Sequence, residues 1–166
     1  MAAGSTYTPI ETKTTSGSIS TTTFSSISGA YTDLVLIVNG GASTGIDLSV
    51  RYNGDTGSNY SVTRLILNNT TPQSNRASSA SSMVLTDAGG ISTTLGATNQ
   101  ILNIMNYANT TTYKSVIFRG NRAAGGLDAT AGLWRSTAAI TSVTLFLSSG
   151  NFTDGTTLTL YGIAAA

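Results

Sequence analysis

The chain has 166 residues, a formal net charge of +1 and only 9% charged residues, and it contains neither cysteine nor histidine. This length suits one domain with a sizeable core. The absence of histidine and cysteine excludes the commonest general base, the commonest metal ligand and all thiolate chemistry. So few charges also disfavour nucleic acid as a partner, because phosphate binding depends on basic side chains.

Serine and threonine are abundant, whereas glutamate and lysine are scarce. A surface covered by hydroxyl and amide groups repels copies of itself only weakly, which favours an oligomer or a place in a larger assembly. The first ten residues lack a basic patch followed by an apolar stretch, so they do not resemble a secretory signal. No apolar run approaches the length of a membrane span, and no membrane partner is expected.

The amino-terminal part predicts an arm over residues 1–10, in which Tyr7 and Ile10 are available to contact a partner. Residues 12–24 are rich in threonine and are typical of an edge strand. The run Leu34–Val38 is the most apolar short segment and predicts a strand buried on both faces.

Residues 46–67 hold two strand-like runs around a reversal that begins at Asn53-Gly54, and this pattern predicts a β-hairpin with a long loop. The side chains of Asn53, Asp55 and Asn59 offer two readings. They could hold a calcium ion, or they could form a hydrogen-bonded turn, and one carboxylate is few for a calcium site.

Residues 68–82 are polar and contain a proline, which predicts a long surface loop. Further strands are expected at 83–85, 99–107 and 113–119, the last with Val116 and Phe118 pointing inward. Glycine-containing segments on both sides of Arg122 predict a mobile loop around it.

The carboxyl-terminal part predicts strands around Leu133-Trp134, over 140–147 and over 158–161, with Phe152 closing one end of the core. In total about nine or ten strands separated by turn signals are expected, with no helical periodicity. The predicted fold is therefore all-β: an antiparallel β-sandwich, jelly-roll-like, that forms a single domain over 11–166. An immunoglobulin topology is less favoured because its cysteine pair is missing.

No arrangement of residues predicts catalysis. The acidic residues mostly stand beside glycines or at strand starts, and turn formation explains them; the many serines have no histidine to activate them. We therefore expect no enzyme activity, no metal and no cofactor. Three arginines, Arg119, Arg122 and Arg135, are candidate partner contacts, with a solvated loop as the alternative.

The aromatic residues also have two readings. They could form a platform on which sugars stack, although aromatic residues at alternating strand positions more often belong to a core or an interface. The residues concerned are Tyr52, Tyr60, Tyr107, Tyr113, Trp134 and Tyr161.

The segments 51–60, 104–114 and 133–136, and the closing pair 150–152 and 155–163, resemble small virion proteins of tailed bacteriophages, notably those of aquatic and cyanobacterial phages. The similarity covers most of the chain from about Tyr31 onward and consists of turn and strand motifs. In that group such domains occur as trimeric capsid decoration proteins and as knobs on tail fibres. The resemblance implies no catalytic residue.

From the resemblance we expect a structural protein of the virion, a capsid decoration (cement) protein that forms a homotrimer and binds the major capsid protein. The alternative is a tail-fibre or receptor-binding knob that contacts tail proteins and recognises a host surface glycan; a free carbohydrate-binding module is a third reading. A fibre tip normally follows a long repetitive shaft, whereas here sandwich strands begin almost at once, which favours decoration.

Overall fold

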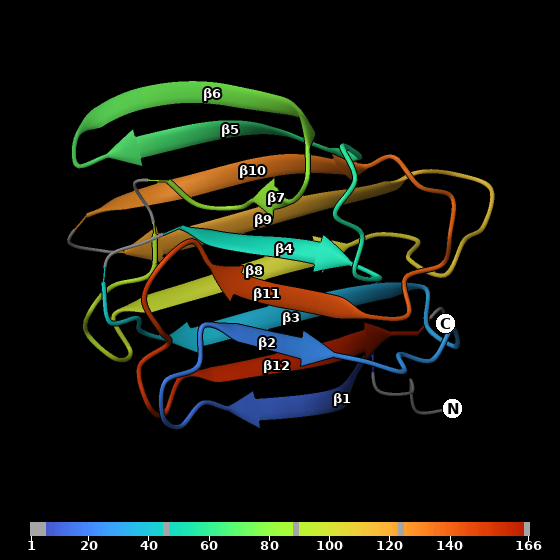
Figure 1. The fold of residues 1–166 in the computed structure, drawn as a ribbon, viewed down its shortest axis with the longest axis horizontal. Helices are drawn as coiled ribbons and strands as arrows, with labels where there is room; N and C mark the ends of the chain where they lie inside the picture. The colour runs from blue at the N-terminus through green and yellow to red at the C-terminus, as the bar shows by residue number, and fades with distance from the viewer. Residues whose placement is uncertain (1–5, 45–46, 88–89, 123–124, 165–166) are drawn as a thin grey trace.

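A computed structural model describes residues 6–44, 47–87, 90–122 and 125–164 of the chain, which form two antiparallel sheets packed face to face (Figure 1). The large sheet has eight strands in the order β1-β12-β3-β8-β9-β10-β5-β6, and the small sheet has four in the order β2-β11-β4-β7. The predicted all-β sandwich of one domain is confirmed. The chain passes repeatedly between the two sheets, as it does in jelly rolls.

The strands are β1 (Tyr7–Thr14), β2 (Thr21–Phe24), β3 (Asp33–Gly40), β4 (Leu48–Tyr52), β5 (Tyr60–Asn68), β6 (Thr71–Ala80), β7 (Met83–Val84), β8 (Thr98–Ile104), β9 (Lys114–Arg122), β10 (Gly126–Trp134), β11 (Val143–Leu147) and β12 (Thr157–Ile163).

The core lies between the sheets and follows the period of two along each strand. In β9, Val116 and Phe118 are buried while Ile117 between them is exposed, as the sequence predicts. In β3, Leu34, Leu36 and Val38 face the core. Phe152 is also buried and pairs with Ala42 in an isolated bridge, which agrees with its expected place at the end of the core.

The prediction of a hairpin over residues 46–67 is wrong. Strand β4 pairs with β11 and β7 in the small sheet, whereas β5 pairs with β10 and β6 in the large sheet. Residues 53–59 therefore form a corner that connects the two layers. A reversal with positive φ at Asn53 and Gly54 serves a corner as well as a hairpin; Ile46, included in the predicted strand, lies outside the described residues.

The Asp55 carboxylate organises this corner. Its Oδ1 accepts a hydrogen bond from the Gly57 amide at 2.8 Å, and its Oδ2 accepts from Asn59 Nδ2 at 2.9 Å and from the indole Nε1 of Trp134 at 2.7 Å. Trp134 belongs to β10 of the large sheet, and its ring stacks on Tyr60. The corner is therefore bound to the large sheet by a side chain inside the sandwich.

Residues 68–82 also differ from the prediction of a surface loop, because Thr71–Ala80 forms strand β6 along β5. This strand is at the edge of the large sheet and is exposed on both faces for nearly its whole length. An edge strand with water on both faces has no reason to alternate apolar and polar residues, so the usual sequence signal is absent.

The segments near the amino terminus and near Arg122 are more regular than predicted. Residues 7–10, assigned to an arm, open strand β1, which pairs with β12 at the opposite edge of the large sheet. The threonine-rich segment 12–24 is divided between β1 and β2, an edge strand of each sheet. Arg122 is the last residue of β9. In both places backbone hydrogen bonds of the large sheet order polar residues that lack an apolar pattern, at an edge for β1 and between two neighbouring strands for Arg122.

We predict that Asp55→Ala lowers the free energy of unfolding by about 1–3 kcal/mol, because it leaves the indole N–H and the Gly57 amide without their acceptor. Urea unfolding followed by tryptophan fluorescence measures the change. Asp154→Ala is the matched control, since Asp154 is exposed in a turn. Equal stability of the Asp55→Ala variant and the native protein would show that the corner does not depend on this carboxylate.

Candidate interaction surface

The large sheet has an outer face that the small sheet does not cover. In Figure 1 the small sheet lies in front of the large one, so the outer face points away from the viewer. Among the described residues, no third layer lies over this face. We call it the outer face; its central part consists of Val35, Ile37, Leu65, Leu67, Asn99, Ile101, Asn103, Ile117, Arg119, Asn121, Leu127, Ala129, Ala131 and Leu133.

Several of the outer-face residues are large and apolar, yet exposed. Leu65 is 65% exposed, and Ile117 and Leu127 are each 48% exposed. Single exposed apolar residues are ordinary, but these belong to three neighbouring strands of one continuous sheet. The outer face is therefore the best candidate for an interaction surface.

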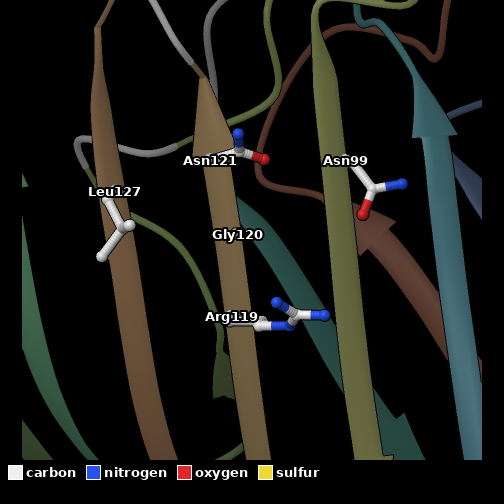
Figure 2. A pocket seen from close by; sticks show the side chains of 5 residues that line it. All are labelled: Asn99, Arg119, Gly120, Asn121 and Leu127. Atoms are coloured by element: carbon white, nitrogen blue, oxygen red, sulfur yellow. The ribbon is translucent and has the colours of Figure 1, made fainter.

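A shallow pocket of about 370 Å³ opens on the outer face and is lined by Asn99, Arg119, Gly120, Asn121 and Leu127. Figure 2 shows the two asparagines on neighbouring strands, with the Arg119 side chain reaching from β9 toward β8. Within the described part of the chain, the side chains of Asn99, Arg119 and Asn121 make no hydrogen bond or ion pair. Their donors are free to bind a ligand.

The structure separates the other sequence-predicted contact residues. Tyr7 is 55% exposed and lines a second pocket, with Val35, Asn103 and Ile117, at another part of the large sheet. Ile10 packs partly against the core. Tyr7 thus shares a surface with Arg119, whereas Ile10 contributes to packing.

The other two predicted arginines do not line the pocket that Arg119 lines. The Arg135 guanidinium donates to the Ser58 carbonyl at 2.6 Å and to the Ser61 hydroxyl, so it fastens the corner to β5. Arg122 lines an adjoining depression, which shares Asn99 and Asn121 with the pocket of Arg119. Of the three arginines, only Arg119 points from the middle of a strand onto the outer face.

The aromatic residues mostly belong to the core. Tyr52, Tyr60 and Tyr107 are fully buried and Trp134 is 2% exposed, whereas Tyr113 is 54% exposed. Burial raises the pKa of Tyr60 to about 12, with the hydrogen bond to Tyr52 acting against it and the charge of Asp55 adding to it. Four of the six candidates for a sugar platform are therefore inaccessible to a sugar.

The carboxylates also take structural roles. Partial burial raises the pKa of Asp55, but the hydrogen bonds from Trp134, Asn59 and Gly57 outweigh burial and lower it. Of the two readings of Asn53, Asp55 and Asn59, the structure therefore has the hydrogen-bonded turn. The Asn53 side chain binds backbone groups of the 139–142 segment, which completes the corner.

Acidic side chains also gather at one end of the sandwich. Asp128 accepts a hydrogen bond from the Asp87 amide at 3.1 Å, and Asn75 connects Asp87 to Arg64. Burial, and secondly the charge of Asp87, raise the pKa of Asp47, while Arg64 lowers it. These groups hold the 85–87 segment against the large sheet. Across the described residues, no group of three His, Cys, Asp or Glu could hold a metal ion.

A buried lysine was not singled out by the sequence. The Lys114 Nζ donates to the carbonyl oxygens of Thr112 at 2.8 Å and Thr137 at 3.2 Å, and burial lowers the pKa of this amine. Both acceptors are backbone groups, so nothing in the side-chain pattern could have identified them.

Sequence reasoning also missed most of the outer face. It selected arginines one at a time and did not identify Asn99, Asn121 or the exposed leucines as neighbours. A usable signal was present in 99–104, where apolar residues occupy both faces of a single strand. The pocket is formed by three consecutive strands, β8, β9 and β10, and the missing information was their register, which pairs Asn99 with Asn121 and Arg119 with Ala129.

No family model and no curated protein matches this chain. Among solved structures, it resembles an exo-inulinase from Aspergillus awamori, with 14% identity and a TM-score of 0.39; the match covers 95% of this chain and 29% of the inulinase. It resembles a xylan β-1,4-xylosidase from Bacillus halodurans at 6% identity and a TM-score of 0.25, over 81% of this chain and 28% of the xylosidase.

A third similar structure is the D2–D3 part of a flagellar cap protein from Escherichia coli, with 15% identity and a TM-score of 0.16; the match covers 90% of this chain and 98% of that one. The chain thus spans less than a third of the two glycosidases it resembles. At these identities and scores the similarities carry no argument about function. In the described part of the chain, no helix is long and apolar enough to cross a bilayer.

We predict that the thermal midpoint changes little between about pH 5.5 and 8, because no histidine or cysteine titrates there. Tyr60 titrates near 10 when unfolded and at about 12 when folded, so stability should fall as pH rises through this interval. Asp55, with its lowered pKa, contributes stability that is lost as pH falls below its unfolded value.

Calorimetry across the pH range measures the thermal midpoint, and tyrosine absorbance at alkaline pH follows the ionisation of Tyr60. Asp47 affects stability in the direction opposite to Asp55. Its raised pKa favours the folded state at low pH and reduces stability once the carboxyl ionises. A steep change between pH 5.5 and 8 would contradict the prediction, and its loss in Asp47→Asn would identify the group responsible.

Proposed function

We propose that this chain is a non-enzymatic structural protein of a tailed-bacteriophage virion, a decoration protein that binds the major capsid protein through its outer face and forms a homotrimer. The observation that carries the proposal is the broad, nearly uncharged outer face of the large sheet. The resemblance of its turn and strand segments to phage virion proteins supplies the biological setting.

The size of the outer face fits a protein partner. Eight strands about 4.8 Å apart, each some seven residues long, give a face of roughly 800 Å². A stable protein interface buries about this area on each partner. Its mixture of aliphatic side chains, amides and one central arginine matches the composition of interface centres, which are depleted in lysine and acidic residues.

The edges of the sheets support self-association. Strands β1 and β6 leave backbone groups at the two edges of the large sheet, and β2 and β7 do so in the small sheet. Such edges must be protected or paired, and the β6 edge has few charges to protect it. A closed ring of three copies would cover edges in a symmetric manner and leave outer faces for the shell.

The proposed function includes no catalytic activity because the carboxylates have structural roles. Asp55, Asp87 and Asp128 are engaged in hydrogen bonds that hold turns. The tail-fibre alternative needs an accessible aromatic platform for sugar, and most candidate rings are buried, which favours decoration over glycan recognition.

We predict a homotrimer at micromolar concentration that is retained on purified capsids of its phage, with attachment that depends little on salt, because few charges are available. Light scattering measures the molar mass, and sedimentation with capsids at increasing salt measures retention. A monomer would contradict the trimer. Retention on tails and not on capsids would contradict the decoration role and support the tail-fibre alternative.

We also predict that the protein does not cleave host surface polysaccharide. No pair of carboxylates is free to act as acid and base among the groups just described. Chain-length analysis of polysaccharide after prolonged incubation measures this outcome, with a known depolymerase as the positive control. Shortened chains would overturn the structural assignment.

A further inference from the structure

We propose that Arg119, with the side-chain amides of Asn99 and Asn121, binds a carboxylate of the protein partner at the centre of the outer face. This inference rests on the proposed function, because it names the contact that orients the partner on that face. The site is the shallow pocket that these three side chains line together with Gly120 and Leu127 (Figure 2).

Among the described residues, no acidic side chain forms an ion pair with Arg119 on the outer face. In the sheet register Arg119 stands between Ile101 of β8 and Ala129 of β10, neither of which carries a charge. The acidic residue on the same side of the sheet is Asp33, at the first residue of β3, where its carboxylate accepts a hydrogen bond from the Asn106 amide. A carboxylate supplied by a partner would complement the isolated guanidinium.

The neighbouring amides make the pocket suitable for an anion with two oxygens. Asn99 and Asn121 are cross-strand partners on β8 and β9; Asn121 is two residues after Arg119, and Asn99 is two residues before Ile101, the β8 partner of Arg119. The guanidinium offers a planar fork of donors that matches a carboxylate, and each asparagine adds an N–H group.

The surroundings favour a protein over an acidic polysaccharide. The side chains around the pocket are aliphatic: Leu127 lines it, Ile101 stands beside Arg119, and Leu65 and Ile117 are exposed nearby. Among the described residues that line the pocket there is no aromatic ring on which a sugar could stack. Aliphatic side chains of a protein partner would pack on these residues and exclude water from the ion pair.

Exclusion of water is what gives the contact its strength. An exposed ion pair contributes little, but a charge-assisted, bidentate pair enclosed by apolar contacts contributes more. Truncation of one member of such a pair weakens binding by about tenfold or more. Lysine would keep the charge but lose the fork, so Arg119→Lys should restore only part of the affinity.

The test uses the full chain labelled with ¹⁵N and two short probes, acetyl-Ser-Leu-Glu-Val-Ser-amide and the same peptide with glutamine in place of glutamate. We expect the glutamate peptide to shift the amide resonances of β8, β9 and β10 and the Arg119 side-chain signal, and to bind about tenfold more tightly than the glutamine peptide. Arg119→Gln should abolish this difference, and Arg119→Lys should retain a part of it.

Arg76→Gln is the matched control, because Arg76 is an exposed arginine on edge strand β6 of the same sheet. It removes the same charge and should leave the preference for glutamate unchanged. Equal binding of the two peptides by the native protein would overturn the inference, as would an Arg119→Gln variant, folded by its spectrum, that still prefers glutamate.

Two further arms separate this inference from its rivals. Polygalacturonate offers carboxylates on a sugar chain; if it shifts the same resonances while the glutamate peptide does not, the site is a glycan site and the inference is wrong. Capsid retention of Arg119→Gln is measured alongside. Undiminished retention would overturn the role of Arg119 and leave the proposed function standing, whereas failure of the native protein to bind capsids would overturn the proposed function itself.

Discussion

The sandwich depends on the corner at residues 53–59, where the carboxylate of Asp55 connects the two sheets. Asp55 binds its own turn through the Gly57 amide and the opposite layer through the Trp134 indole. Because the indole sits in the core beside Tyr52 and Tyr60, the turn cannot relax into a plain hairpin without leaving polar groups unpaired. The corner therefore sends β5 into the large sheet, and β6 follows it there.

This placement explains why the two sheets differ so much in size. With β5 and β6 added, the large sheet has twice as many strands as the small one, and the small sheet cannot supply a second cover. An eight-stranded sheet with apolar residues on both sides exposes one of them unless something else binds. The inner side makes the core, and the outer side keeps Leu65, Ile117 and Leu127 in water. The placement of β5 and β6 in the large sheet thus produces both the buried core on its inner side and the candidate interface on its outer side.

The sequence was sufficient for features that depend on local alternation and insufficient for those that depend on strand order. Val116 and Phe118 were predicted to point inward from the period of two, and they do. The hairpin was wrong because the reversal at Asn53 is compatible with a corner, and only the distant Trp134 decides between them. Strand β6 was missed because its residues contact water on both sides. For the site, arginine chemistry indicated Arg119, but the register that pairs Asn99 with Asn121 is not visible in local alternation, and Leu127 belongs to the start of β10, next to the segment that was predicted to be a loop.

The position of Arg119 suits specificity more than affinity. Aliphatic contacts over a flat sheet are permissive, since a partner that slides by one strand loses little apolar area. A guanidinium among uncharged neighbours distinguishes one docking position from the others. In every displaced position the guanidinium would be buried without a counter-charge, which costs far more free energy than a lost methyl contact. The surrounding amides add direction to the charge. An arginine at the centre of a broad face with few charges can therefore select the register of a partner while most of the binding free energy comes from apolar contacts that depend little on salt.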